Sequence, residues 1–180
     1  GNLATGYSRT ETAARRACSG APFRLPAAPR RIGGLRFLPS QLRTCTQGVA
    51  PTGREGATVA APGRDLAKLA VLERHHATGR VGLGFATNIG LRRGAFASTV
   101  AHDAHNVVVI GVDDADMAAC ACRLAAIGGG SAIAARRSAV AELPLPGAGL
   151  MSDQPLASVP ARQPHLQRRR PTRDAPRTAP

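Results

Sequence analysis

The sequence predicts an α+β fold, in which a small mixed β-sheet packs against one main helix at about residues 113–127, with disordered flanks. Three observations lead to this prediction. The run Val107–Val112 is short, apolar and β-branched, which is typical of a strand covered on both faces. It leads directly into Asp113, a good N-cap for the helix. Beyond the helix, short strands at 131–135 and 138–143 form a predicted hairpin that the following prolines end.

Charge and composition divide the chain of 180 residues, whose formal net charge is +13, into three parts. Residues 1–60 carry nine arginines against two acidic residues, and residues 156–180 carry six arginines against one acidic residue. The stretch between them is nearly neutral, and only this stretch shows hydrophobic periodicity. We therefore predict a disordered Arg/Pro/Gly-rich flank at 1–48, a folded domain at 49–158 and a disordered basic tail at 159–180.

The first strands of the predicted domain lie at 57–60, 66–74 and 95–100, each bounded by turn residues. Four glycines punctuate the stretch from Thr78 to Gly90, so we predict a flexible or close-packed loop there. Their spacing does not match the GxGxxG pattern of a dinucleotide site.

The predicted helix has an apolar face and defined ends. Met117, Ala121 and Leu124 fall on one side of it, and acidic residues occupy its first turn, where they interact favourably with the helix dipole. Gly128–Gly130 follow the helix, so they are predicted to end it as a C-cap rather than to bind phosphate.

A strongly basic chain is typical of proteins that bind nucleic acids or membrane surfaces. Here the positive charge lies in the flanks, without interleaved aromatic residues, and Lys68 is the only lysine among the 24 basic residues. We therefore expect no nucleic-acid partner, and a basic nucleic-acid-associated protein remains an alternative.

The four cysteines form no CxxC pair, and Cys120 and Cys122 lie on different sides of the predicted helix. We expect free thiols in a reducing cytoplasm rather than a disulfide framework or a zinc knuckle. No apolar run reaches membrane-spanning length, and the N-terminus lacks the apolar stretch of a secretory signal. The prediction is a cytoplasmic protein without a membrane partner.

The main candidate site lies directly before the predicted strand that begins at Val107. His102, Asp103, His105 and Asn106 fall within five residues, where a buried strand can hold polar groups rigidly. A structural alternative is that Asp103 and Asn106 cap turns while the histidines satisfy buried backbone groups. On a strand the side chains of His102 and His105 would face opposite ways, and on a tight turn they could converge. The spacing alone gives little support for a metal bound by this pair, because it identifies neither a third ligand nor the geometry.

A weaker candidate site lies at the end of the predicted strand 66–74. Glu73, Arg74 and His75 come together there, where polar side chains can line a pocket. The alternative is that Glu73 and Arg74 form a solvated strand end.

Six ordered blocks in the segment from about Val49 to about Ser158 resemble the C-terminal domain of bacterial adenine deaminases, in the amidohydrolase superfamily. The blocks are Val71–His75 with Thr78–Gly79, Gly82–Phe85, Ala97–Asn106, Asp114–Met117, Ile127–Gly130, and Ala141–Pro146 with Ala148–Ser152. The resemblance does not extend to the metal-bearing TIM barrel that full-length members carry upstream. We therefore expect a fragment that is inactive alone.

The resemblance implies a hydrolase of purine catabolism or salvage, which converts adenine to hypoxanthine and ammonia with a divalent metal, manganese or iron, that activates water. In this chain it implies a pocket wall at His102, Asp103, His105 and Asn106, able to bind purine nitrogens, move protons or orient metal ligands of the barrel. It implies no cofactor bound by this chain itself. The expected partners are adenine and a separate amidohydrolase barrel, and homo-oligomers are compatible with the sequence. A non-functional gene remnant with flanks from a shifted reading frame is a further alternative.

Overall fold

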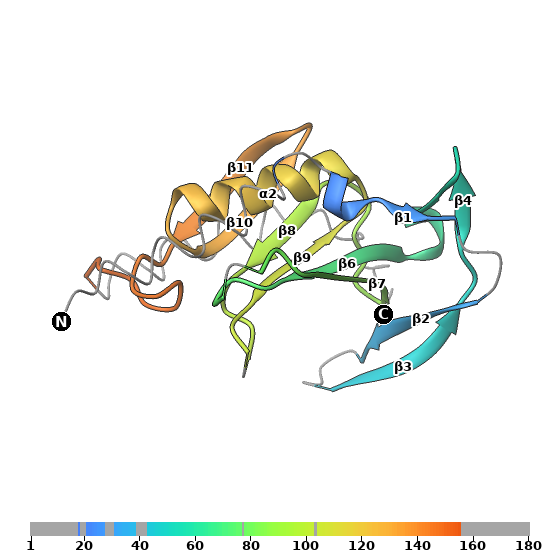
Figure 1. The fold of residues 1–180 in the computed structure, drawn as a ribbon, viewed down its shortest axis with the longest axis horizontal. Helices are drawn as coiled ribbons and strands as arrows, with labels where there is room; N and C mark the ends of the chain where they lie inside the picture. The colour runs from blue at the N-terminus through green and yellow to red at the C-terminus, as the bar shows by residue number, and fades with distance from the viewer. Residues whose placement is uncertain are drawn as a thin grey trace, which may run out of the picture.

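The computed structural model describes Cys18 and residues 21–27, 31–38, 43–76, 78–102 and 104–155. Asp103 and the predicted tail at 159–180 lie outside the described residues. Within them the chain forms two β-sheets and one α-helix (Figure 1). No helix of this part of the chain is long and apolar enough to cross a membrane.

The main sheet has eight strands in the order β11-β10-β8-β9-β6-β7-β2-β3. Its strands are β2 (Ile32–Phe37), β3 (Thr44–Val49), β6 (Leu66–Leu72), β7 (Val81–Thr87), β8 (Ala95–Ser98), β9 (Val107–Gly111), β10 (Gly130–Ala135) and β11 (Ser138–Pro144). Neighbouring strands are antiparallel except for β2 and β7, which pair in parallel, so the sheet is mixed. The smaller sheet contains β1 (Leu25–Pro26), β5 (Ala57–Val59) and β4 (Thr52–Arg54).

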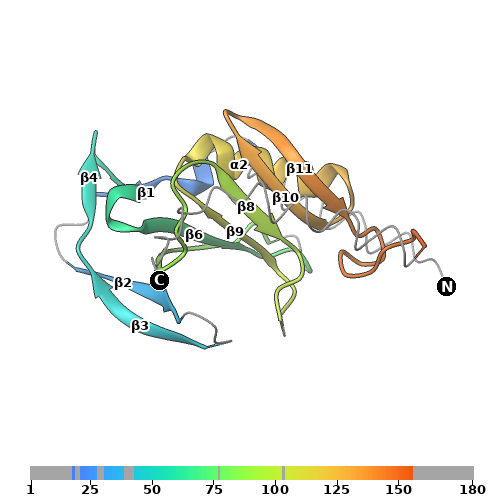
Figure 2. The same cartoon turned by 180° about the vertical axis from the view of Figure 1, so that it is seen from behind.

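Helix α2 (Asp114–Ala126) begins and packs as the sequence predicts. The Asp113 carboxylate accepts hydrogen bonds from the backbone N–H groups of Ala115 and Asp116, at 2.9 and 3.0 Å, which makes it the N-cap. The helix lies on one side of β8, β9 and β10 (Figures 1 and 2). The predicted α+β fold of a mixed sheet packed against one main helix is confirmed.

The core lies between α2 and the sheet. Its buried members are Phe23, Ala70, Leu72, Ala95, Ala97, Val107, Val109, Met117, Ala118, Cys120, Ala121, Leu124, Ala132 and Ala134. Most are small or aliphatic, so the helix must approach the strands closely to exclude water. Gly111 permits this approach, because a Cβ there would lie 2.4 Å from Cγ of Met117. The predicted strand at 107–112 is therefore the central strand β9, which α2 covers tightly on one face, whereas Val108 and Ile110 on its other face are half-buried.

An ion pair between a buried lysine and a partly exposed aspartate connects α2 to the middle of the sheet. Lys68 on β6 is 3% exposed, and its Nζ donates to Asp114 Oδ1 at 2.7 Å and to the carbonyl oxygen of Phe23 at 3.0 Å. Phe23 ends the 3-10 helix η2 (Ala21–Phe23). One lysine therefore links η2, β6 and the first turn of α2.

The prediction of a disordered flank at 1–48 is wrong where the structure describes it, because β1, β2 and most of β3 lie within that range. β3 is an edge strand with mostly exposed side chains, so it has no apolar alternation that the sequence could reveal. β2 depends on pairing with the distant strand β7.

The prediction of a loop around the glycines after Thr78 is also wrong, because Val81–Thr87 form β7. In this strand Val81, Leu83 and Phe85 alternate with small residues, and β7 pairs along its whole length with β6. The side chains of these three residues pack on the core side. Glycine is unfavourable in strands by local preference, and here the pairing with β6 outweighs that preference.

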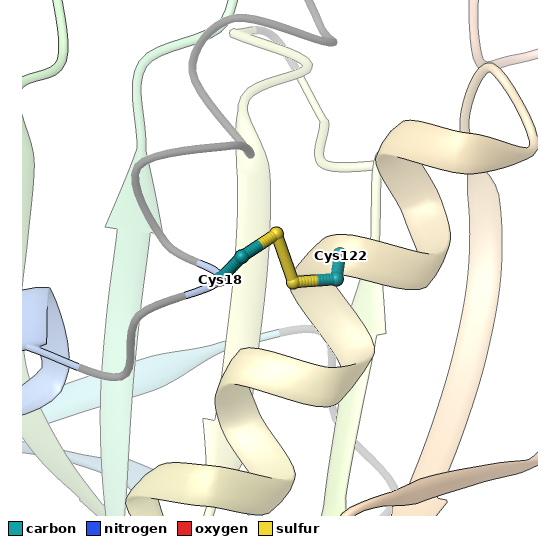
Figure 3. The surroundings of a disulfide bond; sticks show 2 residues. All are labelled: Cys18 and Cys122. Atoms are coloured by element: carbon teal, nitrogen blue, oxygen red, sulfur yellow. A yellow bond between two sulfur atoms is a disulfide. The ribbon is translucent and has the colours of Figure 1, made fainter.

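The prediction of free thiols is wrong for Cys18 and Cys122, which form a disulfide with their Cα atoms 5.3 Å apart (Figure 3). A separation of 104 residues gives no sign of this pairing in the sequence. Cys45 is exposed and free, whereas the free Cys120 is buried, and burial raises the pKa of its thiol to about 12. The disulfide also removes the free-thiol argument for a reducing compartment, so the cytoplasmic location stays a prediction.

Candidate functional site

The candidate site lies at one edge of the main sheet, where three strand ends meet. The last residue of β6, Leu72, pairs with the first residue of β9, Val107, and the last residue of β8, Ser98, pairs with Val108. The segments that leave β6 and β8 and the one that enters β9 therefore lie side by side. We call the following set the polar edge: Glu73, Arg74, His75, His102, His105 and Asn106.

Arg74 is the buried centre of the polar edge, with 6% of its surface exposed. Its Nε donates to the carbonyl oxygen of His105, and its Nη2 donates to that of Ala148 at 2.7 Å. Burial lowers the pKa of its guanidinium. The guanidinium also lies against Gly149, where a Cβ would be 2.4 Å from Nη1. Arg74 therefore fastens two turns to the end of β6.

A second contact from the same strand end fixes the turn that holds the candidate histidines. Nε2 of His75 lies 2.7 Å from the carbonyl oxygen of Ala104, to which it donates when it carries the proton. Within the turn, the His105 N–H donates to the carbonyl oxygen of Ala101 at 2.7 Å. This bond holds His105 at a φ of 47°, in the left-handed region that side chains rarely adopt. Such conformations persist where the surroundings enforce them, often at functional sites.

Thr99, which the sequence pattern does not single out, fixes the turn around Ala148 and Gly149 that Arg74 also contacts. Its side chain is fully buried, and Oγ1 donates to the carbonyl oxygen of Gly149 at 2.6 Å while accepting from the N–H of Gly130 at 2.7 Å. A threonine at the end of a predicted strand gives no signal of this role, because both partners lie in segments distant in the sequence.

Two polar atoms of the polar edge are buried without a hydrogen-bond partner in the described structure. They are Nδ1 of His105 and Oδ1 of Asn106. Leaving such an atom unsatisfied costs about 1–3 kcal/mol, so buried polar groups are normally paired. The rings of His102 and His105 lie with their centroids 6.5 Å apart and their planes 47° apart, so the turn brings them close, as a strand would not. The adjacent residues His105 and Asn106 therefore each keep one polar atom that could still take a hydrogen bond.

Glu73 has a different role from the other residues of the polar edge. Its carboxylate accepts hydrogen bonds from the N–H groups of His75, His76 and Thr78 and from the Thr78 hydroxyl. Desolvation alone would raise its pKa, but these hydrogen bonds lower the pKa of Glu73 to about 2. The carboxylate is therefore an ionised cap of its own turn and a poor proton acceptor at neutral pH.

Replacing Glu73 with glutamine is expected to destabilise the chain at neutral pH, by an amount that falls as the pH is lowered. The pKa of Glu73 lies below its ordinary value of 4.5 in the folded chain, so its stabilising effect is full above about pH 4.5 and is lost towards pH 2. Urea unfolding between pH 7 and pH 2 measures this difference from the parent chain. The control Glu55→Gln removes an exposed carboxylate and should change stability little. A difference for Glu73→Gln that is independent of pH would contradict this account.

The residues of the polar edge do not fit the divalent metal of amidohydrolases. In the described part of the chain, no group of three or more histidine, cysteine or acidic side chains could hold a metal ion. We therefore derive no step of a reaction through a metal at this edge. Its groups can hydrogen bond, orient and exchange protons with a bound molecule.

Comparison with known proteins identifies the family. The adenine deaminase C-terminal domain family matches residues 41–177, which begins before the predicted domain boundary at Val49 and ends beyond Ser158. The chain belongs to this family. The match includes the polar edge and seven of the eight strands of the main sheet, from β3 onward.

The similar proteins are adenine deaminases. The chain is 55% identical over 130 residues to the adenine deaminase of Oleidesulfovibrio alaskensis, and the match covers 71% of this chain and 23% of the relative. It is 45% identical over 140 residues to that of Desulfatibacillum aliphaticivorans, covering 78% of this chain and 25% of the relative. It is 41% identical over 162 residues to the adenine deaminase of a Methylobacterium species, and the match covers 87% of this chain and 28% of the relative. The chain therefore spans about a quarter of the length of the curated relatives it matches.

Proposed function

We propose that this chain forms one wall of the adenine site in a complete adenine deaminase and does not release ammonia from adenine by itself. The observation that carries the proposal is the pair of unsatisfied atoms at the polar edge, Nδ1 of His105 and Oδ1 of Asn106. The family membership supplies the reaction, and the polar edge supplies groups suited to bind a purine. The remaining three quarters of a relative's chain would supply the rest of the site.

The chemistry of the two atoms matches the edge of adenine. Ring nitrogens of adenine accept hydrogen bonds and its exocyclic amine donates them. Oδ1 of Asn106 is an acceptor for that amine, and Nδ1 of His105 either donates or accepts, depending on its tautomer. Both atoms are buried, so binding requires the segment that carries them to open. The exposed His102 stands at the rim of the turn at 101–106.

The metal of the complete enzyme, manganese or iron, would supply activated water for attack on the ring carbon that bears the amine. In this proposal the metal is bound outside this chain. Arg74 and His75 hold the turn in place through backbone carbonyl groups. Their part is to orient His105 and Asn106 towards the purine.

Ammonia release from adenine tests the proposal. The partner in the assay is the deaminase remainder, which we define as the Oleidesulfovibrio alaskensis adenine deaminase expressed without the region that matches this chain. We expect no ammonia from this chain alone, little from the metal-loaded deaminase remainder alone, and ammonia when the two are mixed. The control mixture contains this chain after heat denaturation. Turnover by the isolated chain would contradict the proposal.

A further inference from the structure

We propose that the face of the main sheet opposite α2 is the surface on which the rest of the adenine deaminase polypeptide packs. This inference rests on the proposed function, because it names the surface through which the polar edge reaches the rest of the enzyme.

The face opposite α2 is apolar and half-buried. The strand register places Val71 opposite Val108, and Leu69 opposite Ile110, on the side that points away from the core residues Ala70 and Leu72. The face carries Leu35, Leu69, Val71, Val108 and Ile110, all half-buried. Phe96, on the same face, packs against the buried residues Ile133, Leu143 and Leu145. Figures 1 and 2 show α2 on the other side of β6, β8 and β9, and no helix of the described residues covers this side. An apolar sheet face of this kind is normally covered in a folded protein.

A hollow of about 260 Å³ lies in this face between β6, β7 and β2. Gly82 and Gly84 of β7 stand opposite Val71 and Leu69 of β6, so two positions that would carry side chains are empty. Leu35 on β2 forms the far wall of the hollow. A Cβ atom built on Gly84 would meet no heavy atom within 4 Å. Packing within this chain therefore does not require a glycine at this position. The hollow therefore has the shape to receive an apolar side chain from a partner.

The deaminase remainder is the occupant that the observations favour. The residues named above on the face opposite α2 are uncharged. Such a composition is typical of the core of a permanent interface rather than of a transient one. The relatives have about three quarters of their length outside the matched region, because the match covers 23–28% of their chains. Leu72 and Val107, which pair at the end of these strands, are directly followed by Glu73 and preceded by Asn106, both in the polar edge. A partner that covers the face thus also reaches the polar edge.

Association of the full chain with the deaminase remainder tests the inference. The two polypeptides are mixed, the mass of the complex is measured by light scattering, and the affinity by titration calorimetry. We expect a one-to-one complex that Gly84→Leu weakens by at least about tenfold, because leucine fills the hollow. The matched control is Gly53→Leu on β4, whose Cβ also meets nothing within 4 Å but which lies in the smaller sheet. It should bind like the parent chain, and circular dichroism should show that both variants are folded.

Three outcomes would overturn the inference. The first is equal affinity of the Gly84→Leu and Gly53→Leu chains for the deaminase remainder. The second is no association by the folded parent chain, and the third is a symmetric dimer of this chain that Gly84→Leu dissociates. Association is measured by mass and heat, not by deamination, so a complex that is inactive on adenine would contradict the proposed function and leave the interface supported.

Discussion

Replacing Arg74 with alanine should lower the free energy of unfolding by about 3 kcal/mol. The substitution leaves the carbonyl oxygens of His105 and Ala148 without the donors that Nε and Nη2 provide. It also empties the space that a buried guanidinium fills beside Gly149. Two unsatisfied acceptors, at about 1–3 kcal/mol each, account for the expected loss. Urea denaturation at pH 7 measures it.

Two further variants test whether the loss of stability in Arg74→Ala comes from the two hydrogen bonds that the guanidinium donates. Arg74→Lys keeps the charge but cannot span both carbonyl groups, so it should recover only part of the loss. Arg80→Ala removes an exposed arginine from the start of the next strand and should change stability by less than about 0.5 kcal/mol. If Arg74→Ala were as stable as Arg80→Ala, Arg74 would not hold the two turns together.

Replacing Asp114 with alanine should destabilise the fold by about 3 kcal/mol, because it leaves Lys68 as a buried charge without a counter-ion. Lys68 is 3% exposed, and the carbonyl oxygen of Phe23 would be its one remaining partner among the described residues. The pair joins α2 to β6, so the loss should appear in the cooperative unfolding of the whole domain, measured by urea denaturation.

The origin of this loss is tested by removing the lysine charge as well. The double variant Lys68→Met/Asp114→Ala should be more stable than Asp114→Ala alone, because a methionine at position 68 leaves no charge to bury. Glu55→Ala breaks an ion pair with Arg54 in which both side chains are largely exposed, so it should cost less than about 1 kcal/mol. A double variant that is less stable than Asp114→Ala would show that Lys68 stabilises the fold by other means.

The parts of the fold that could be predicted are those with strong local signals. The N-cap at Asp113 and the apolar run at Val107 each specify structure within a few residues. β7 could not be predicted in this way, because Gly82 and Gly84 mask the alternation of the residues between them. Its structure comes from pairing with β6, which the local sequence does not show.

The candidate site was predicted as two separate groups, and the structure joins them. The pairing of β6 with β9 places Arg74 beside His105, although 31 residues separate them in the sequence. Arg74 and His75 act through the backbone of the turn, and Glu73 caps its own strand end. Residue types alone could not distinguish these roles from direct contact with a substrate, because the roles depend on which atoms are buried and which are paired. The involvement of Asp103 remains a prediction.

We propose that the polar edge belongs to the adenine site of a complete deaminase. The most direct test is the rate of ammonia release from adenine by the deaminase remainder mixed with saturating His105→Ala or Asn106→Ala chain. The account predicts that each variant lowers kcat at least about tenfold while binding the deaminase remainder as tightly as the parent chain, and that Val140→Ala, on the exposed strand β11, changes neither. Parental kcat for both variants in a fully formed complex would contradict it.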